Sequence, residues 1–126
     1  MRAAELLALC WMPGHRTPIH DHSGSGGWVL GVAGSLEETR YTVAPGTGDD
    51  MRLERFDSAS VSAGDVSYID DAIGLHKIEN AGNENAISLH LYSPPIDACR
   101  YFDERTGRFG IKRMSYHSVD GIVGGA

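Results

Sequence analysis

Short runs of alternating polar and apolar residues recur along the whole chain, and each run is closed by glycine, proline, asparagine or aspartate. Glycine alone accounts for 16 of the 126 residues, and no long amphipathic helical pattern occurs. Because successive side chains of a strand point to opposite faces, such runs indicate half-buried β-strands. Many short strands with regular turn signals predict an all-β sandwich or barrel. At this length we expect a single domain over residues 1–126, with a sizeable hydrophobic core.

The expected strands are short and follow these runs. We expect them over residues 6–11, 28–33, 36–43, 51–56, 87–92 and 114–117, while the segment 61–68 is expected to contain a turn. Residues 63–65 predict a hairpin-like turn, and the polar residues 103–108 predict another turn. Residues 45–50 are expected to form a loop and 119–126 a frayed tail. Trp11 and Trp28 are both expected in the core.

Charge and hydropathy exclude several classes of partner. The net charge is −6 and no basic cluster occurs, so we expect no nucleic-acid partner. No apolar run approaches the length of a membrane span, and the apolar start of the chain is interpreted as a buried strand rather than a signal peptide. Cys10 and Cys99 are expected to be buried free thiols, which fits a reducing cytoplasm. The sequence therefore predicts a cytoplasmic protein, and we expect a monomer.

The segment from Gly14 to Gly34 carries the first chemical signal, the pair His20 and His22. On a strand, residues two apart share a face, so both imidazoles can point into one cavity. Converging imidazoles suit zinc, copper, iron and nickel, although the pair alone is also compatible with two surface histidines. A third ligand must come from a distant strand, and the candidate is His76 in GLHKIEN. The alternative for His76 is a strand histidine next to a turn.

A second polar row lies in SLHLYSPP, where Ser88, His90 and Tyr92 share one face of a predicted strand. The opposite face is apolar and is expected to pack into the core: Ile87, Leu89 and Leu91. Polar side chains directed inward are costly unless they bond to each other or to a ligand. Ser88 is placed to bond His90, and His90 to orient Tyr92. The alternative is a strand with some buried polar groups.

Together these motifs resemble the cupin superfamily and, within it, the cysteine dioxygenase (type I) family. Gly14, His20, His22 and Gly34 fit the first cupin motif, whose glutamate position falls at a glycine here. His76 and Asn80 fit the end of the second motif. The segments most similar to cysteine dioxygenases are PIHDH, GSLEETRY, GLHKIEN, SLHLYSPP and the C-terminal DACRYFDERTGRFGIKRMSYHS.

The resemblance implies a cupin-type β-barrel, that is, a double-stranded β-helix or jelly roll. It implies that His20, His22 and His76 bind one Fe(II) per chain, and that Ser88, His90 and Tyr92 form the catalytic row beside the metal. The implied reaction oxidises L-cysteine with O2 to cysteine sulfinic acid. A dioxygenase for another small thiol, such as 3-mercaptopropionate, and a catalytically weak metal-binding cupin are the alternatives. The family also has a cis bond at the position of Ser93-Pro94.

Two departures from the family pattern lead to further expectations. The family's carboxylate-binding arginine lies before Met1, so the chain is N-terminally short relative to the family, and Arg16 and Arg100 are the candidate substitutes. The family's cysteine that cross-links to the active-site tyrosine is replaced by Gly27, so no thioether to Tyr92 is expected. We do not expect Cys99 to take that role, because the SPP segment turns the backbone away. His15 and His117 are interpreted as structural.

Overall fold

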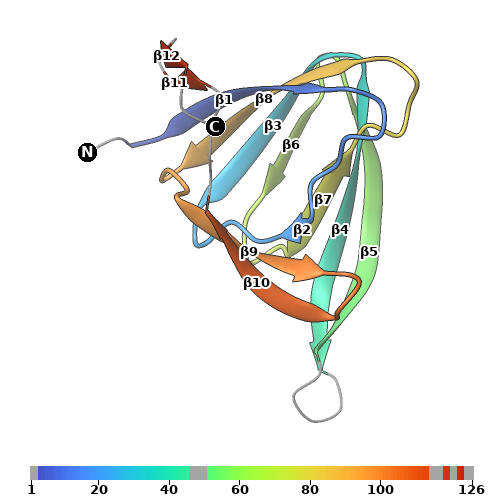
Figure 1. Ribbon diagram of the computed structural model, residues 1–126, viewed down its shortest axis with the longest axis vertical. Coiled ribbons are helices and arrows are strands. Elements are labelled where there is room, and N and C mark those ends of the chain that lie inside the picture. The colour runs from blue at the N-terminus through green and yellow to red at the C-terminus, as the bar shows by residue number, and fades with distance from the viewer. Residues whose placement is uncertain (1–2, 46–50, 114–117, 120–121, 124–126) are drawn as a thin grey trace.

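The computed structural model describes residues 3–45, 51–113, 118–119 and 122–123 (Figure 1). Every regular element in these ranges is a β-strand, which confirms the all-β prediction. In the same ranges, no helix is long and apolar enough to cross a membrane. The strands are β1 (Glu5–Trp11), β2 (Ile19–His20), β3 (Gly26–Ala33), β4 (Ser35–Pro45), β5 (Met51–Ser62), β6 (Val66–Ile69), β7 (Leu75–Glu79), β8 (Ala86–Ser93), β9 (Ala98–Asp103), β10 (Arg108–Arg113), β11 (Ser118–Val119) and β12 (Ile122–Val123).

Two antiparallel sheets curve around a shared interior (Figure 1). One has the strand order β1-β8-β3-β6, and the other has the order β10-β9-β2-β7-β4-β5. The short strands β11 and β12 pair with each other. A cluster of buried side chains fills part of the interior: Trp11, Val29, Leu36, Val61, Ile78 and Ala86.

Several predicted strands are confirmed and others differ. β1, β4 and β8 contain the predicted runs, and the turn after β9 lies within residues 103–108. β9 and β10 have no counterpart among the predicted strands, whereas β7 carries His76, which was expected on a strand distant from His20. The turn at residues 63–65 is present but makes no hairpin, because β5 pairs with β4 whereas β6 pairs with β3 in the other sheet. Of the predicted loop at 45–50, Pro45 is the last residue of β4 and the rest lies outside the described residues, as does the predicted strand at 114–117. Val119 pairs with Ile122 instead of fraying.

The prediction of which face of β8 packs into the core is wrong. Ser88 and His90 are buried, whereas Ile87 and Leu91 are 38% and 37% exposed on the outer face of the sheet. Alternation separates two faces but does not say which faces inward. Here the interior holds the polar row, because that row satisfies its hydrogen bonds there.

The same outer face carries two further residues that were expected to be buried. Trp28 is 38% exposed and packs against Tyr68, with ring centroids 4.8 Å apart. Cys10 is exposed, while Cys99 is buried as expected, and both are free thiols. An apolar residue on the outer face of a strand cannot be distinguished from a core residue by its type alone.

Gly31 marks a close approach between β3 and the turn that follows β5. The register of β3 on β8 shifts between Gly31 and Ala33, and the Gly31 backbone exchanges hydrogen bonds of 2.9 Å with Asp65 and Gly64. A Cβ at Gly31 would lie 2.1 Å from the carbonyl oxygen of Ser62. Only glycine therefore fits here without backbone movement.

We expect Gly31→Ala to lower the free energy of unfolding by about 1–3 kcal/mol, because the added methyl group forces the backbone apart. Urea unfolding followed by tryptophan fluorescence measures this change. Gly82→Ala is the matched control, since a Cβ there meets only the Asn80 side chain at an ordinary 3.5 Å. Equal stability of the two variants would contradict the close-approach argument.

Candidate metal centre

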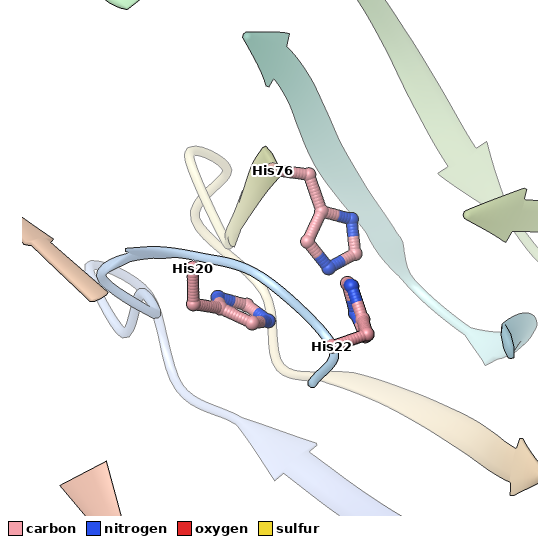
Figure 2. A group of neighbouring side chains, drawn as sticks. All are labelled: His20, His22 and His76. Carbon is pink, nitrogen blue, oxygen red and sulfur yellow. The ribbon is translucent and has the colours of Figure 1, made fainter. Parts of the chain in front are cut away.

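Three histidine side chains from two segments point toward one another in the barrel interior (Figure 2). His20 on β2 is the direct cross-strand partner of His76 on β7. The ring centroids of His76 lie 4.7 Å from those of both His20 and His22, and the latter two lie 5.2 Å apart. The candidate ligand nitrogens all lie within 4.8 Å of one another. Such a group has the spacing to hold a metal ion.

The convergence of His20 and His22 has a different cause from the one expected. β2 ends at His20, so His22 lies in the turn that follows and not on the strand. Both carboxylate oxygens of Asp71 accept hydrogen bonds of 2.8 Å, one from the backbone N–H of His22 and one from that of Gly24. Asp71 therefore holds the turn that brings His22 back toward His20.

The hydrogen bonds of the three rings leave nitrogens available for a ligand. His20 Nδ1 bonds the carbonyl oxygen of Pro18 at 2.8 Å, and His76 Nδ1 bonds Glu38 Oε2 at 2.7 Å. Each of these rings donates through Nδ1, so its Nε2 lone pair is free. Both nitrogens of His22 are buried and have no hydrogen-bond partner among the described residues. Since an orphaned buried nitrogen is costly, the donor set fits a bound metal ion.

Burial keeps the imidazoles of His20 and His22 neutral. It lowers the pKa of His20 to about 3, with the nearby His76 adding to the effect. Burial likewise lowers the pKa of His22 to about 2, again with a contribution from His76. A neutral imidazole carries the lone pair that a metal ion needs.

Glu38 on β4 supports His76 and was not identified from the sequence. Burial alone would raise the pKa of Glu38, but hydrogen bonds from His76 and Ser67 outweigh it and lower the pKa to about 2. Ser67 Oγ donates to Glu38 Oε1 at 2.6 Å, and Arg40 Nε donates to the same oxygen at 3.3 Å. A carboxylate behind a ligand histidine fixes its tautomer and orientation. The sequence did indicate an inward position for Glu38, because strand alternation places it on the same face of the predicted strand as the apolar Leu36.

The row Ser88, His90 and Tyr92 lies as its spacing predicts. Ser88 Oγ and His90 Nε2 are 2.7 Å apart, and His90 Nδ1 and Tyr92 Oη are 3.4 Å apart. Burial raises the pKa of Tyr92 to about 12, with further contributions from Cys99 and Glu5, so its phenol is protonated at neutral pH. The Ser93-Pro94 bond is cis, as expected.

One cavity of about 220 Å3 is lined by members of both the histidine group and the row on β8. Its lining consists of Leu7, Leu9, Thr17, Pro18, His20, His76, Ile78, His90, Tyr92, Cys99, Lys112 and Arg113. Neither cation proposed from the sequence is among these residues. Arg100 pairs with Asp21 at 3.1 Å and lies over the ring of Phe109. Arg16 is exposed, and its backbone forms an isolated β-bridge with that of Glu79. Lys112 and Arg113 are the cations that reach the cavity.

The surroundings of Tyr92 bear on the expected absence of a thioether. A Cβ at Gly27 would lie 3.2 Å from Tyr92 Cε1, so this glycine does occupy the position beside the tyrosine ring. Cys99 is not turned away from Tyr92 as expected. Cys99 packs in one buried cluster with Tyr92 and Ile96, because β9 returns along the barrel after the prolines.

We expect the metal-free protein to lose stability as the pH falls from 6.5 toward 4. His20, His22 and His90 have folded-state pKa values of about 3, 2 and 4, each lowered mainly by burial. The unfolded chain binds protons near pH 6.5 and the folded chain does not, so each histidine costs up to about 1.4 kcal/mol per pH unit in this window. Urea unfolding at pH 7.5, 6.5 and 5.5 measures the slope.

The variant His90→Gln serves as the comparison, and its slope should be shallower by about one third. A free energy of unfolding that does not change between pH 7.5 and 5.5 would show that these imidazoles are not buried in their neutral form.

Comparison with known proteins finds sequence relatives over most of this chain. Residues 3–105 match the family described as cysteine dioxygenase type I. The chain is 41% identical over 120 residues to cysteine dioxygenase type 1 of Rattus norvegicus and of Homo sapiens. In each case the match covers 93% of this chain and 58% of the relative. The Danio rerio protein of the same name is 38% identical over 117 residues.

Solved structures share the fold. A sugar phosphate isomerase of the cupin superfamily from Silicibacter pomeroyi aligns over 100% of this chain and 74% of its own, with a TM-score of 0.60 and 15% identity. A double-stranded β-helix protein from Klebsiella pneumoniae aligns over 90% of this chain and 78% of its own, with a TM-score of 0.58 and 16% identity. At these identities the likeness concerns the fold alone, and it confirms the expected cupin-type barrel.

Proposed function

The chain belongs to the cysteine dioxygenase type I family, and we propose that it oxidises L-cysteine with O2 to cysteine sulfinic acid. The chain spans 58% of the length of the curated relatives it matches. The observation that carries the proposal is the orphaned, neutral His22 beside two further imidazoles whose Nε2 atoms are free, next to a protonated tyrosine. In the reaction both oxygen atoms of O2 join the sulfur, and the electrons that sulfur loses are those that O2 gains.

We propose that His20, His22 and His76 hold one Fe(II) per chain. Three imidazoles on one face of an ion leave open positions, so bound Fe(II) would supply the site at which a thiol substrate and O2 meet. Because imidazole also suits copper and zinc, the choice of iron rests on family membership. Both cysteines are free thiols, and we also propose a cytoplasmic, monomeric enzyme.

The side chains around the cavity have separate tasks in this proposal. Tyr92 lines the cavity and keeps its phenolic proton at neutral pH, so it is a hydrogen-bond donor to oxygen atoms beside the sulfur. His90 and Ser88 hold Tyr92 in place through their hydrogen bonds. Leu7, Leu9 and Ile78 provide the apolar part of the lining, which limits competing water.

The carboxylate of the substrate requires a cation, and we propose Lys112. It is the direct cross-strand partner of Cys99, so both side chains lie on the same face of the β9–β10 hairpin. Tyr101, two residues from Cys99, pairs with His20, which places this face toward the metal ligands. Lys112 lines the cavity and forms no ion pair with any residue that the structure describes.

The direct test is product formation by the iron-loaded chain. With L-cysteine and 18O2 we expect cysteine sulfinic acid that carries two heavy oxygen atoms, detected by mass spectrometry. Iron that binds at one per chain without any sulfinate would instead favour a metal-binding cupin without turnover. Sulfinate from 3-mercaptopropionate but not from L-cysteine would show that another small thiol is the substrate.

Two variants separate metal binding from turnover in the same assay. His22→Ala removes the ring with the orphaned nitrogens, so it should lose both iron and product. Tyr92→Phe should retain iron, measured by elemental analysis, and lose most of the product. Full iron content in His22→Ala would contradict the ligand assignment, and unchanged product in Tyr92→Phe would remove the phenol from the mechanism.

We expect Lys112→Met to raise the KM for L-cysteine by roughly 10–100-fold, since a hydrogen bond to a charged group contributes about 1.5–3 kcal/mol. Cysteamine has the same thiol and amine but no carboxylate, so its KM should not change. Lys112→Arg keeps the charge and should retain a KM for L-cysteine close to that of the parent protein. An equal rise for both thiols would contradict a contact between Lys112 and the carboxylate.

A further inference from the structure

Trp11 extends the row on β8 into a chain of four buried side chains. The indole Nε1 of Trp11, at the end of β1, donates to Ser88 Oγ at 2.9 Å. Ser88 Oγ lies 2.7 Å from His90 Nε2, and His90 Nδ1 lies 3.4 Å from Tyr92 Oη. All four residues are at most 7% exposed. Because the four side chains are shielded from water, the donor and acceptor roles in each of these hydrogen bonds depend on those in the others.

The indole sets the direction of the first two hydrogen bonds. An indole N–H is a donor and never an acceptor, so Ser88 Oγ accepts from Trp11. Ser88 is fully buried, and the remaining described partner for its own proton is His90 Nε2. An unbonded hydroxyl in the interior would be costly, so Ser88 donates to His90 Nε2.

The direction of these bonds then sets the tautomer of His90. Burial, assisted by the nearby His76, lowers the pKa of His90 to about 4, so the ring is neutral at pH 7. A neutral imidazole whose Nε2 accepts carries its proton on Nδ1. That N–H faces Tyr92 Oη, which accepts it at 3.4 Å. The proton of Tyr92 itself is then directed away from His90 and into the cavity that Tyr92 lines.

We propose that Trp11 is a positioning residue that fixes His90 as the Nδ1–H tautomer and thereby presents the Tyr92 hydroxyl to the cavity as a donor. The catalytic consequence rests on the proposed function, whereas the tautomer does not. Without the indole, Ser88 Oγ is free to accept from His90 Nε2–H. His90 Nδ1 would then accept from Tyr92, and the phenolic proton would turn away from the substrate.

The tautomer is measured by long-range 1H–15N NMR on zinc-loaded protein with labelled histidine, because Zn2+ binds imidazole and is diamagnetic. At pH 7.5 we expect His90 as the Nδ1–H form, with its signals assigned by their loss in His90→Gln. Trp11→Phe should shift His90 toward the Nε2–H form. Trp28→Phe is the matched control, since Trp28 lies 38% exposed on the outer face and should leave the signals unchanged.

Kinetics of the iron-loaded protein provide the second readout. Trp11→Phe should lower kcat roughly 10-fold while iron content and the KM for L-cysteine stay close to those of the parent, because only the donor direction of Tyr92 changes. If Trp11→Phe does not fold, Ser88→Ala provides the same test, since it removes the donor to His90 Nε2.

The outcomes separate this inference from the proposed function. His90 as the Nε2–H form in the parent protein, or an unchanged Nδ1–H form in both Trp11→Phe and Ser88→Ala, would overturn the inference. A parent protein that makes no sulfinate would overturn the proposed function, and the NMR result would still decide the role of Trp11.

Discussion

The hydrogen bond between His76 Nδ1 and Glu38 Oε2 is the contact on which the site depends. Both groups are almost fully buried, and a buried carboxylate without a partner would be strongly destabilising. Glu38 also accepts from Ser67, which lies on β6 in the other sheet. One carboxylate therefore orients a ligand candidate and links the two sheets. The position of the His76 imidazole therefore depends on how the two sheets pack against each other.

A second polar network approaches the cavity from the opposite sheet. Trp11 on β1 and the row on β8 belong to the four-stranded sheet, whereas His20 and His76 belong to the six-stranded sheet. The interior between the sheets is thus built from two satisfied polar networks rather than from an apolar core alone. This arrangement explains why the apolar residues of β8 lie on its outer face. The register of β8 decides which set of side chains lies inside, and hydrogen bonding across the interior favours the polar set.

The site residues that could be predicted from the sequence are those whose positions follow from their spacing along one strand. Ser88, His90 and Tyr92 share a strand face because the strand period is two, and the structure shows the bonds that this spacing allows. From the sequence, His22 was expected to converge with His20 through strand alternation. The convergence depends instead on the carboxylate of Asp71, which is 49 residues from His22 along the chain. The position of the exposed Lys112 beside the cavity likewise depends on pairing across a hairpin. Such contacts between distant residues leave no periodic trace in the sequence.

The charges around the cavity suit the substrate proposed for it. Among the described residues that line it, none is a carboxylate, and the lining imidazoles His20 and His90 are neutral at pH 7. Tyr92 retains its proton, so it adds no negative charge either. A divalent metal ion would therefore add positive charge to a lining that already holds the exposed cations Lys112 and Arg113, while the carboxylate of Glu38 lies behind His76. A thiolate that also carries a carboxylate supplies two negative groups, one toward the metal ion and one toward the exposed Lys112. This charge pattern supports the proposal that the substrate is an amino-acid thiolate.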